Sequence, residues 1–138
     1  MNEHPIVIVE DNTEDCGFLT EALIIVGVTN PLRCFDNAIK AMEYLQETNE
    51  IPFVIISDVK MPMMSGLEFR RSIVDDKKLM KKNIPFIFLS TLSPSVYAKE
   101  VEKLSVQGHF KKPSDFTDMV HLTRSIIESL NRVGAMTK

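Results

Sequence analysis

The sequence predicts an α/β fold in which a five-stranded parallel sheet carries helices on both of its faces. Five short apolar runs recur along the chain, and each precedes a stretch with the spacing of an amphipathic helix. The runs at 5–9, 52–57 and 85–89 are continuous rather than alternating, which is typical of strands covered on both faces. Repeated strand–helix units imply parallel strands joined by right-handed crossovers. A chain of 138 residues, 44% of them hydrophobic, suits one such domain.

The elements follow one another in strict alternation. Strands are expected at 5–9, 30–35, 52–57, 85–89 and 109–111. Helices are expected at 13–26, 37–48, 66–76, 94–106 and from 115 to about 132. The charged run 75–82 is expected to be a solvated loop, and the tail 134–138 to be frayed, so that the folded core spans about 4–131.

Small polar residues mark the helix starts. Residues suited to the N-cap position precede four of the helices: Asp36, Ser65, Ser93 and Ser114. Ser65 and Glu68 have the spacing of a capping box, in which each side chain accepts from the other residue's backbone N–H. Pro94 suits the first position of its helix, and Gly108 lies near the expected end of that helix.

Charge and cysteine content exclude several classes of protein. Lys and Arg number 16 and Asp and Glu 19, a net charge of −3, so nothing favours nucleic acid or an anionic membrane as a partner. No apolar run approaches the roughly 18 residues of a membrane helix. Cys16 and Cys34 cannot form a zinc cluster alone. One disulfide is possible, but the lack of a secretory signal favours a reducing cytoplasm and buried or half-buried thiols.

Polar side chains gather where the expected strands end. The first strand ends in Glu10 and Asp11, the third in Asp58, the fourth in Ser90 and Thr91, and the fifth in Lys111, Lys112 and Pro113. Because the carboxyl ends of parallel strands share one edge of the sheet, these groups are expected to converge there. Crowded carboxylates call for a cation, and Mg²⁺ with its preference for oxygen ligands fits them. An ammonium and a hydroxyl beside such an ion suit phosphoryl transfer to a carboxylate nucleophile.

The motifs at these strand ends resemble those of the receiver domain of two-component response regulators. They are Ile-Val-Glu10-Asp11-Asn12, Ser57-Asp58-Val-Lys60-Met61-Pro62-x-x-x-Gly66, Phe-Leu-Ser90-Thr91 and His109-Phe-Lys-Lys112-Pro113. The resemblance covers about residues 4–131 and implies the flavodoxin-like strand order 2-1-3-4-5 in a single domain over 1–138. With no output domain in its 138 residues, the chain is most similar to the stand-alone, chemotaxis-like members.

The resemblance implies a role for each acidic residue. Asp58 matches the phosphoacceptor, and Asp58 and Lys112 match the two groups that take part in the chemistry. Asp11 would bind Mg²⁺ directly and Glu10 mainly through a water, with Asp58 and the backbone carbonyl of Lys60 completing the protein ligands. The Lys60 side chain would lie near the phosphoryl group or point away into solvent. The domain would be a phosphoacceptor that assists its own phosphorylation and dephosphorylation rather than an enzyme.

Four further positions match the phosphate-binding and switch residues of the family. Ser90 matches the switch hydroxyl, and Thr91 follows it, where its bulk would narrow access to the phosphoryl group. Lys112 matches the lysine that precedes a proline, usually through a cis peptide bond; its neighbour Lys111 would face solvent by strand alternation. His109 stands where relatives carry a switch aromatic, and it is either that switch or a partly exposed strand histidine.

The implied partner is the phosphohistidine of a sensor histidine kinase or of a histidine phosphotransfer protein. An unknown downstream protein would bind the face formed by 94–106, 109–111 and the last helix. Three alternatives compete with this interpretation. A haloacid-dehalogenase-type phosphatase requires Asp-x-Asp, where this chain has Asp58 followed by Val59 and Lys60. A flavodoxin-like binding module requires a phosphate loop rather than acids after the first strand. A receiver that signals without phosphate would not need the intact acidic set.

Overall fold

The computed structural model describes residues 4–137 and confirms the predicted α/β fold. Its five strands form one parallel sheet in the order β2-β1-β3-β4-β5, the order that the family resemblance implied. The strands are β1 (Ile6–Val9), β2 (Leu32–Phe35), β3 (Val54–Ser57), β4 (Phe86–Ser90) and β5 (Gly108–Lys111). Strands β1, β3 and β4 are buried along their whole length, as their continuous apolar runs predict.

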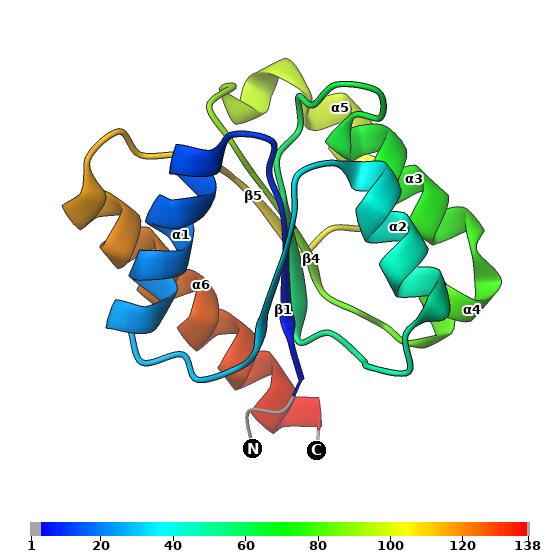
Figure 1. Cartoon of the computed structure of the whole chain (residues 1–138), viewed down its shortest axis with the longest axis horizontal. Coiled ribbons are helices and arrows are strands. Elements are labelled where there is room, and N and C mark those ends of the chain that lie inside the picture. The colour runs from blue at the N-terminus through cyan, green and yellow to red at the C-terminus, as the bar shows by residue number, and fades with distance from the viewer. Residues whose placement is uncertain (1–3, 138) are drawn as a thin grey trace.

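Helices cover both faces of the sheet (Figure 1). On one face lie α1 (Thr13–Ile25) and α6 (Phe116–Thr137). The other face carries α2 (Ala38–Glu47), α3 (Gly66–Asp75), the short α4 (Lys77–Lys81), the 3₁₀ turn η1 (Pro94–Val96) and α5 (Ala98–Glu102). This sandwich of helix, sheet and helix leaves the carboxyl ends of the strands open at one edge.

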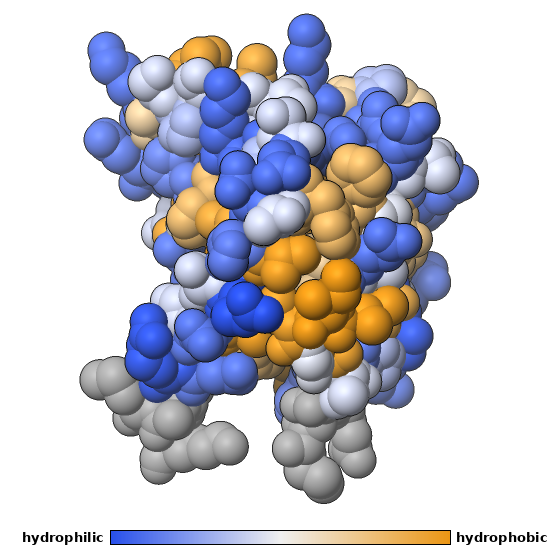
Figure 2. All heavy atoms as spheres, turned by 90° about the vertical axis from the view of Figure 1, so that its left-hand side faces the viewer, coloured by the Kyte–Doolittle hydropathy of each residue, from blue (hydrophilic) through white to orange (hydrophobic). Residues whose placement is uncertain are grey.

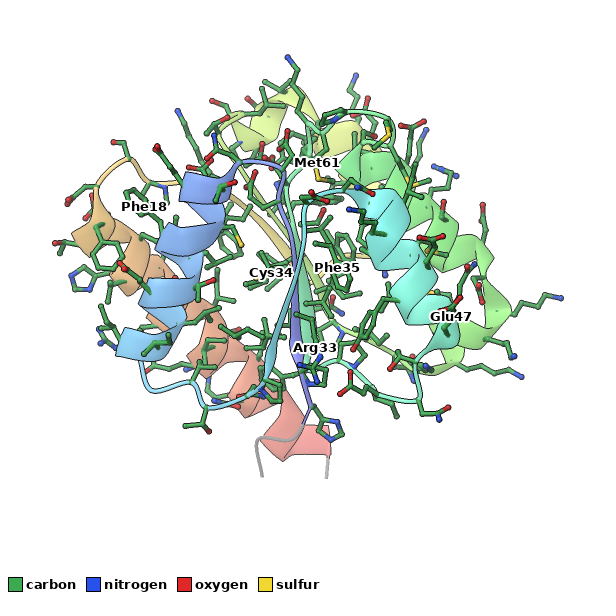
Figure 3. All side chains as sticks on the ribbon, in the orientation of Figure 1. Phe18, Arg33, Cys34, Phe35, Glu47 and Met61 are labelled. Atoms are coloured by element: carbon green, nitrogen blue, oxygen red, sulfur yellow. The ribbon has the colours of Figure 1, made fainter. Side chains whose placement is uncertain are left out.

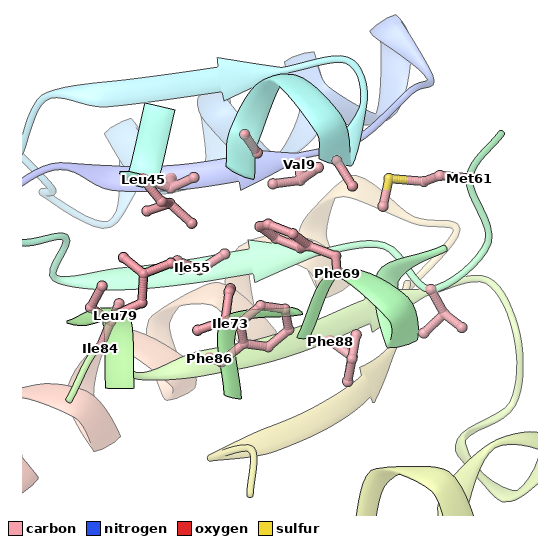
Figure 4. Packing of buried hydrophobic residues seen from close by; sticks show 14 of the residues in the cluster. Val9, Leu45, Ile55, Met61, Phe69, Ile73, Leu79, Ile84, Phe86 and Phe88 are labelled. Carbon is pink, nitrogen blue, oxygen red and sulfur yellow. The ribbon is translucent and has the colours of Figure 1, made fainter. Parts of the chain in front are cut away.

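Alternation along the strands divides the core into two clusters. Val7 and Val9 of β1 face α2 and α3, whereas Ile6 and Ile8 face α1 and α6. Figure 4 shows the first cluster, in which the rings of Phe69, Phe86 and Phe88 fill the space between α3 and the sheet. Burying a side chain of this size contributes about 1.5–3 kcal/mol, so both clusters hold the sheet against its helices.

Two helix starts differ from the sequence prediction. Asn37, rather than Asp36, caps α2, and its side chain accepts from the backbone N–H of Lys40 at 2.9 Å. The last helix begins at Phe116, so Asp115 rather than Ser114 precedes it. The capping box of Ser65 and Glu68 is confirmed, with both reciprocal hydrogen bonds present.

Two charged or terminal segments are more ordered than predicted. Within 75–82, expected as a loop, Lys77–Lys81 form α4, because the Asp76 side chain caps it and Leu79 buries itself in the core. The last helix runs to Thr137 instead of ending near Arg132 with a frayed tail, since one glycine in a helix interior costs only about 1 kcal/mol. Lys138 lies outside the described residues.

The predicted helix over 94–106 is wrong. The chain forms only the three-residue turn η1 and the five-residue α5, and Ser93 makes no side-chain cap hydrogen bond. The segment then turns at Ser105, whose φ of 51° is left-handed, and Gly108 is the first residue of β5 rather than a helix cap. A helix of this length without a cap is marginal by itself, so the segment depends on packing Tyr97 and Val101 into the core.

A buried arginine fastens this segment to α3. Arg70 is only 4% exposed, and its guanidinium donates to the backbone carbonyls of Leu104 at 2.9 Å and Ser105 at 2.7 Å. The guanidinium also lies over the ring of Phe86, 5.1 Å from its centroid. Arg70 therefore joins α3, β4 and the turn before β5.

The α1 and α6 side of the surface carries exposed apolar side chains. Figure 2 shows an apolar area on this side of the molecule, and Phe18, Ile24 and Ile25 of α1 are each about half exposed, at 45%, 61% and 55%. Between residues 4 and 137, no helix has the length and apolar character needed to cross a membrane.

Candidate functional site

Four strand ends meet at one edge of the sheet and are tied together by their backbones. The N–H of Asp58 donates to the carbonyl of Val9 at 3.0 Å, which fixes the end of β3 beside the end of β1. The N–H of Lys112 donates to the carbonyl of Ser90 at 2.7 Å, which does the same for β5 and β4. The side chains that follow these strands therefore project from adjacent, anchored positions.

The ammonium of Lys112 lies at the centre of the acidic edge. Its side chain is only 7% exposed, and Nζ donates to Glu10 Oε1, to Asp15 Oδ2 at 3.0 Å and to Asp58 Oδ2 at 3.3 Å. All three donor positions of the ammonium are thus engaged by carboxylates. A charge buried this deeply is stable only because it is paired on every side.

Burial and charge shift the titration of this cluster. Burial of the Glu10 carboxyl, with the nearby charge of Asp58, raises the pKa of Glu10 to about 7, although the hydrogen bond from Lys112 opposes the shift. Burial alone would lower the pKa of Lys112, but hydrogen bonds to Glu10 and Asp15 and the charge of Asp58 outweigh it and raise that pKa. Lys112 is therefore a permanent cation at neutral pH.

Three carboxylates are close enough to share one metal ion. Oxygens of Glu10, Asp11 and Asp58 all lie within 4.8 Å of one another, with Glu10 and Asp58 buried and Asp11 exposed. Hard oxygen donors at this spacing suit a divalent cation such as Mg²⁺ or Mn²⁺. Lys60 lies two residues beyond Asp58 with an exposed side chain, and Lys111 is exposed as predicted.

The backbone around Asp58 is held rigidly. Asp58 Oδ1 accepts from the N–H of Val59 at 2.7 Å, and the hydroxyl of Ser57 donates to the Asp58 carbonyl at 2.8 Å. Gly66 packs against the same carbonyl so closely that an added Cβ would lie 1.9 Å from its oxygen. The start of α3 therefore supports the end of β3 directly, which only a glycine at position 66 allows.

The other side of the edge is less completely bonded. Ser90 is buried and its Oγ accepts from the N–H of Leu92 at 3.2 Å, whereas Thr91 is exposed. His109 is half-buried, and its ring meets that of Tyr97 edge-to-face with centroids 5.8 Å apart. Among the described residues, His109 Nδ1 and the Tyr97 hydroxyl are buried without a hydrogen-bond partner. Burial and, to a lesser degree, the charge of Asp58 raise the pKa of Tyr97, so its hydroxyl is neutral.

A comparison with known protein families decides where this arrangement belongs. The sequence model of the response regulator receiver domain matches residues 6–124, which is most of the chain. The chain belongs to this family. Membership sets the receiver apart from haloacid-dehalogenase-type phosphatases and from flavodoxin-like binding modules, the two unrelated alternatives that the sequence had left open.

The receiver is similar to parts of larger proteins. It is 32% identical over 89 residues to YesN of Bacillus subtilis, an uncharacterized transcriptional regulatory protein, covering 64% of this chain and 23% of YesN. It is 30% identical over 129 residues to ycf29 of Porphyra purpurea, a probable transcriptional regulator, covering 91% of this chain and 58% of ycf29. The receiver thus spans less than two thirds of either relative.

Solved structures share the fold of the receiver over nearly its full length. The phosphorylated cyanobacterial phytochrome response regulator RcpA has a TM-score of 0.82 at 26% identity, covering 91% of this chain and 92% of RcpA. The Mn²⁺-bound form of the response regulator Rcp1 has a TM-score of 0.78 at 23% identity, covering 89% and 91%. At that identity the second likeness concerns the fold alone.

The receiver structure differs from the sequence expectation in two details of the site. Asp15 was missed; it lies in the first turn of α1, where its backbone N–H donates to the side chain of the N-cap Asn12. The cis peptide that the resemblance implied before Pro113 is absent, because every peptide bond in the described residues is trans. The Lys112 ammonium nevertheless reaches the carboxylates, since its four-carbon side chain spans the distance.

Proposed function

We propose that this receiver takes a phosphoryl group from the phosphohistidine of a sensor histidine kinase or of a histidine phosphotransfer protein onto Asp58. One observation carries the proposal: the Asp58 carboxylate lies 3.3 Å from the buried ammonium of Lys112. It also lies within 4.8 Å of carboxylate oxygens of Glu10 and Asp11. A carboxylate that attacks a phosphoryl group needs positive charge beside it, because both groups are negative. The Lys112 ammonium supplies one such charge, and a cation held by the three carboxylates would supply more.

The residues present fit a divalent cation, and we assign Mg²⁺ to them. Asp11 and Asp58 would bind it directly with the Lys60 carbonyl, and Glu10 would act through a water because Lys112 already holds one of its oxygens. When bound, the ion supplies positive charge that offsets the crowded carboxylates and the phosphoryl oxygens. The Mn²⁺ in the related Rcp1 structure is consistent with oxygen ligands of this kind.

The chain's own residues perform the transfer. An Asp58 carboxylate oxygen attacks phosphorus while the bond from phosphorus to the donor histidine nitrogen breaks, so the imidazole leaves with the electron pair of that bond. Val59 N–H holds the other carboxylate oxygen at 2.7 Å and orients the attack. Lys112 is placed to hold a phosphoryl oxygen beside Asp58, and Ser90 to donate its hydroxyl to another, with the exposed Thr91 at the entrance.

The product is a switch rather than a released metabolite. Phosphorylation adds about two negative charges at neutral pH beside Lys112. A Ser90 hydroxyl drawn to the phosphoryl group gives up its hydrogen bond with Leu92, and His109 lies on the neighbouring strand to occupy released space. We assign the response to the face formed by η1, α5, β5 and α6, which would bind a downstream protein. We further propose that residues 4–131 form one cytoplasmic domain, and that this domain binds neither nucleic acid nor membrane.

Intact mass spectrometry tests the assignment. The chain is incubated with Mg²⁺ and phosphoramidate, whose phosphorus–nitrogen bond reproduces that of phosphohistidine, and with a phosphorylated histidine kinase in parallel. We expect a gain of about 80 Da, one phosphoryl group, that disappears in Asp58→Asn. Asp75→Asn, which removes an exposed aspartate at the end of α3, should label normally. Labelling that persists in Asp58→Asn would refute the phosphoacceptor.

A further inference from the structure

The two cysteines of the chain face each other between α1 and β2. Cys16 lies in the first turns of α1, half-buried against the core cluster that contains Ile8. Cys34 pairs in register with that same Ile8, so its side chain points to the α1 face of the sheet. Figure 3 shows Cys34 on the α1 side of β2 and Phe35 on the α2 side. Cys34 is exposed, contrary to the sequence expectation, because β2 is an edge strand.

Both cysteines line one open groove of about 340 Å³ between α1 and β2. Burial, together with the neighbouring Cys34 thiol, raises the pKa of Cys16 to about 11. Glu10 and Asp11 line the same groove, and the charge of Glu10 acts on the Cys16 thiol. The thiol pair therefore adjoins the carboxylates to which we assign Mg²⁺.

We propose that Cys16 and Cys34 form a reversible intramolecular disulfide at the rim of the metal site. Two free thiols that line one groove from facing elements can form the bond once their Cβ atoms lie about 3.5–4.5 Å apart. Cys34 is exposed to solvent and to small oxidants, whereas Cys16 is half-buried in the same groove. This is the arrangement of an attacking thiol with a resolving partner.

The oxidant that we assign is a low-molecular-weight disulfide such as glutathione disulfide. The Cys34 thiolate attacks one sulfur of that disulfide, which forms a mixed disulfide and releases one glutathione thiolate. Cys16 then loses its proton to water and attacks the Cys34 sulfur, which releases the second glutathione. Overall, two protein thiols are oxidised to one disulfide while one glutathione disulfide is reduced to two thiols. An excess of glutathione reverses both steps.

Oxidation would act on the metal site through α1, and this step rests on the proposed function. Bonding shortens the separation of the two sulfurs to about 2.05 Å, so the first turns of α1 move toward β2. Those turns carry Asp15, which bonds Lys112, and Asp11 lies just before their N-cap Asn12. Because Mg²⁺ demands near-ideal geometry, displacing these groups should weaken its binding by roughly tenfold, the lower end of the effect of disturbing a supporting shell.

Alkylation and mass spectrometry test the disulfide itself. The reduced chain is treated with glutathione disulfide, alkylated with N-ethylmaleimide and weighed intact without reductant. We expect a loss of about 2 Da with no alkylation, restored to two alkylations by dithiothreitol. Cys16→Ser should instead retain a glutathione adduct on Cys34. A wild-type chain that keeps two alkylatable thiols, retains the glutathione adduct, or forms intermolecular dimers overturns the proposal.

Calorimetric titration with Mg²⁺ tests the coupling. The oxidised wild-type chain should bind Mg²⁺ about tenfold more weakly than the reduced chain, whereas Cys34→Ser, which lacks the exposed thiol that the oxidant attacks, should bind it after the same treatment as the reduced chain does. Equal affinities of the oxidised and reduced forms overturn the coupling. Failure of the reduced chain to bind Mg²⁺ at all counts against the proposed function, while the mass measurement on the disulfide stands separately.

Discussion

The acidic edge and the segment that follows β4 lie next to each other but are built in opposite ways. At the acidic edge, Lys112 has three carboxylate partners and both oxygens of Asp58 are engaged. In the segment after β4, α5 has five residues and no side-chain cap. The Tyr97 hydroxyl in this segment and Nδ1 of His109, which faces it from β5, are buried without a partner in the described part of the chain. The first region is preorganised, whereas the second holds polar groups that another arrangement would satisfy better. A switch requires both properties, because the reaction needs fixed groups and the response needs a neighbouring segment that can change its conformation.

Removing the central ammonium should break the preorganised side most severely. In Lys112→Met, we expect the rate of phosphorylation by phosphoramidate to fall by about 100-fold or more, because no cation remains to hold a phosphoryl oxygen against Asp58. The rate is followed by intact mass over time. Lys111→Met, which removes the exposed neighbouring ammonium, is the matched control and should label at the wild-type rate. Equal rates for the two variants would show that Lys112 is a structural cation only.

A methyl group at Gly66 should break the backbone support of Asp58. Its Cβ would lie 1.9 Å from the Asp58 carbonyl oxygen, so Gly66→Ala is expected to lower the free energy of unfolding by about 2–4 kcal/mol in urea titrations. Gly17→Ala is the control, because that helical glycine has nothing within 4 Å of an added Cβ and should stabilise by about 0.5–1 kcal/mol. Equal free energies of unfolding for the two variants would mean that the start of α3 can shift away from the Asp58 carbonyl without cost.

Binding of Mg²⁺ should stabilise the acidic edge further and so increase its difference from the segment after β4. At Mg²⁺ concentrations of 10 to 100 times its Kd, the free energy of unfolding should rise by about 1.4–2.7 kcal/mol, since the ion binds only the folded chain. Thermal unfolding with Mg²⁺ and with a chelator measures the shift. Asp11→Asn should abolish it, and Glu14→Gln, an exposed change nearby in α1, should preserve it. A full shift in Asp11→Asn would remove that residue from the ligand set.

The smallest effect should come from the weakly held segment, and its sign is the informative part. Tyr97→Phe deletes a buried hydroxyl without a partner, so we expect the free energy of unfolding to rise by about 0.5–1 kcal/mol. Tyr44→Phe is the matched control, because the Tyr44 hydroxyl donates to Glu50 Oε1 at 2.5 Å and its loss should destabilise by about 1 kcal/mol. Destabilisation by Tyr97→Phe in the urea titration would indicate that its hydroxyl has a partner.

The same contrast separates what the sequence predicts from what it does not. Continuous apolar runs predict β1, β3 and β4, and the shared edge of parallel strands then predicts that Glu10, Asp58 and Lys112 converge. These inferences work because burial on both faces and parallel topology leave few alternatives.

Other features depend on tertiary packing that no local pattern records. The sequence predicts one helix over 94–106, yet the non-helical backbone of Tyr97 separates η1 from α5, and α5 ends at Glu102, before the turn at Ser105 that Arg70 holds. The bond from Lys112 to Asp15 depends on how α1 lies against the sheet, not on the sequence near either residue. The helix α4 forms from a charged run because Leu79 finds a place in the core.

The buried guanidinium of Arg70 also sets a mechanical limit on the switch. It fixes the carbonyls of Leu104 and Ser105 to α3, and α3 starts at Gly66 in contact with the Asp58 carbonyl. Residues 91–103 are therefore held at both ends: they follow β4 directly, and they lead into the turn that Arg70 fixes to α3. A displacement that begins at Ser90 must be taken up between these two anchors, where Tyr97 and Val101 are buried in the core and have to repack.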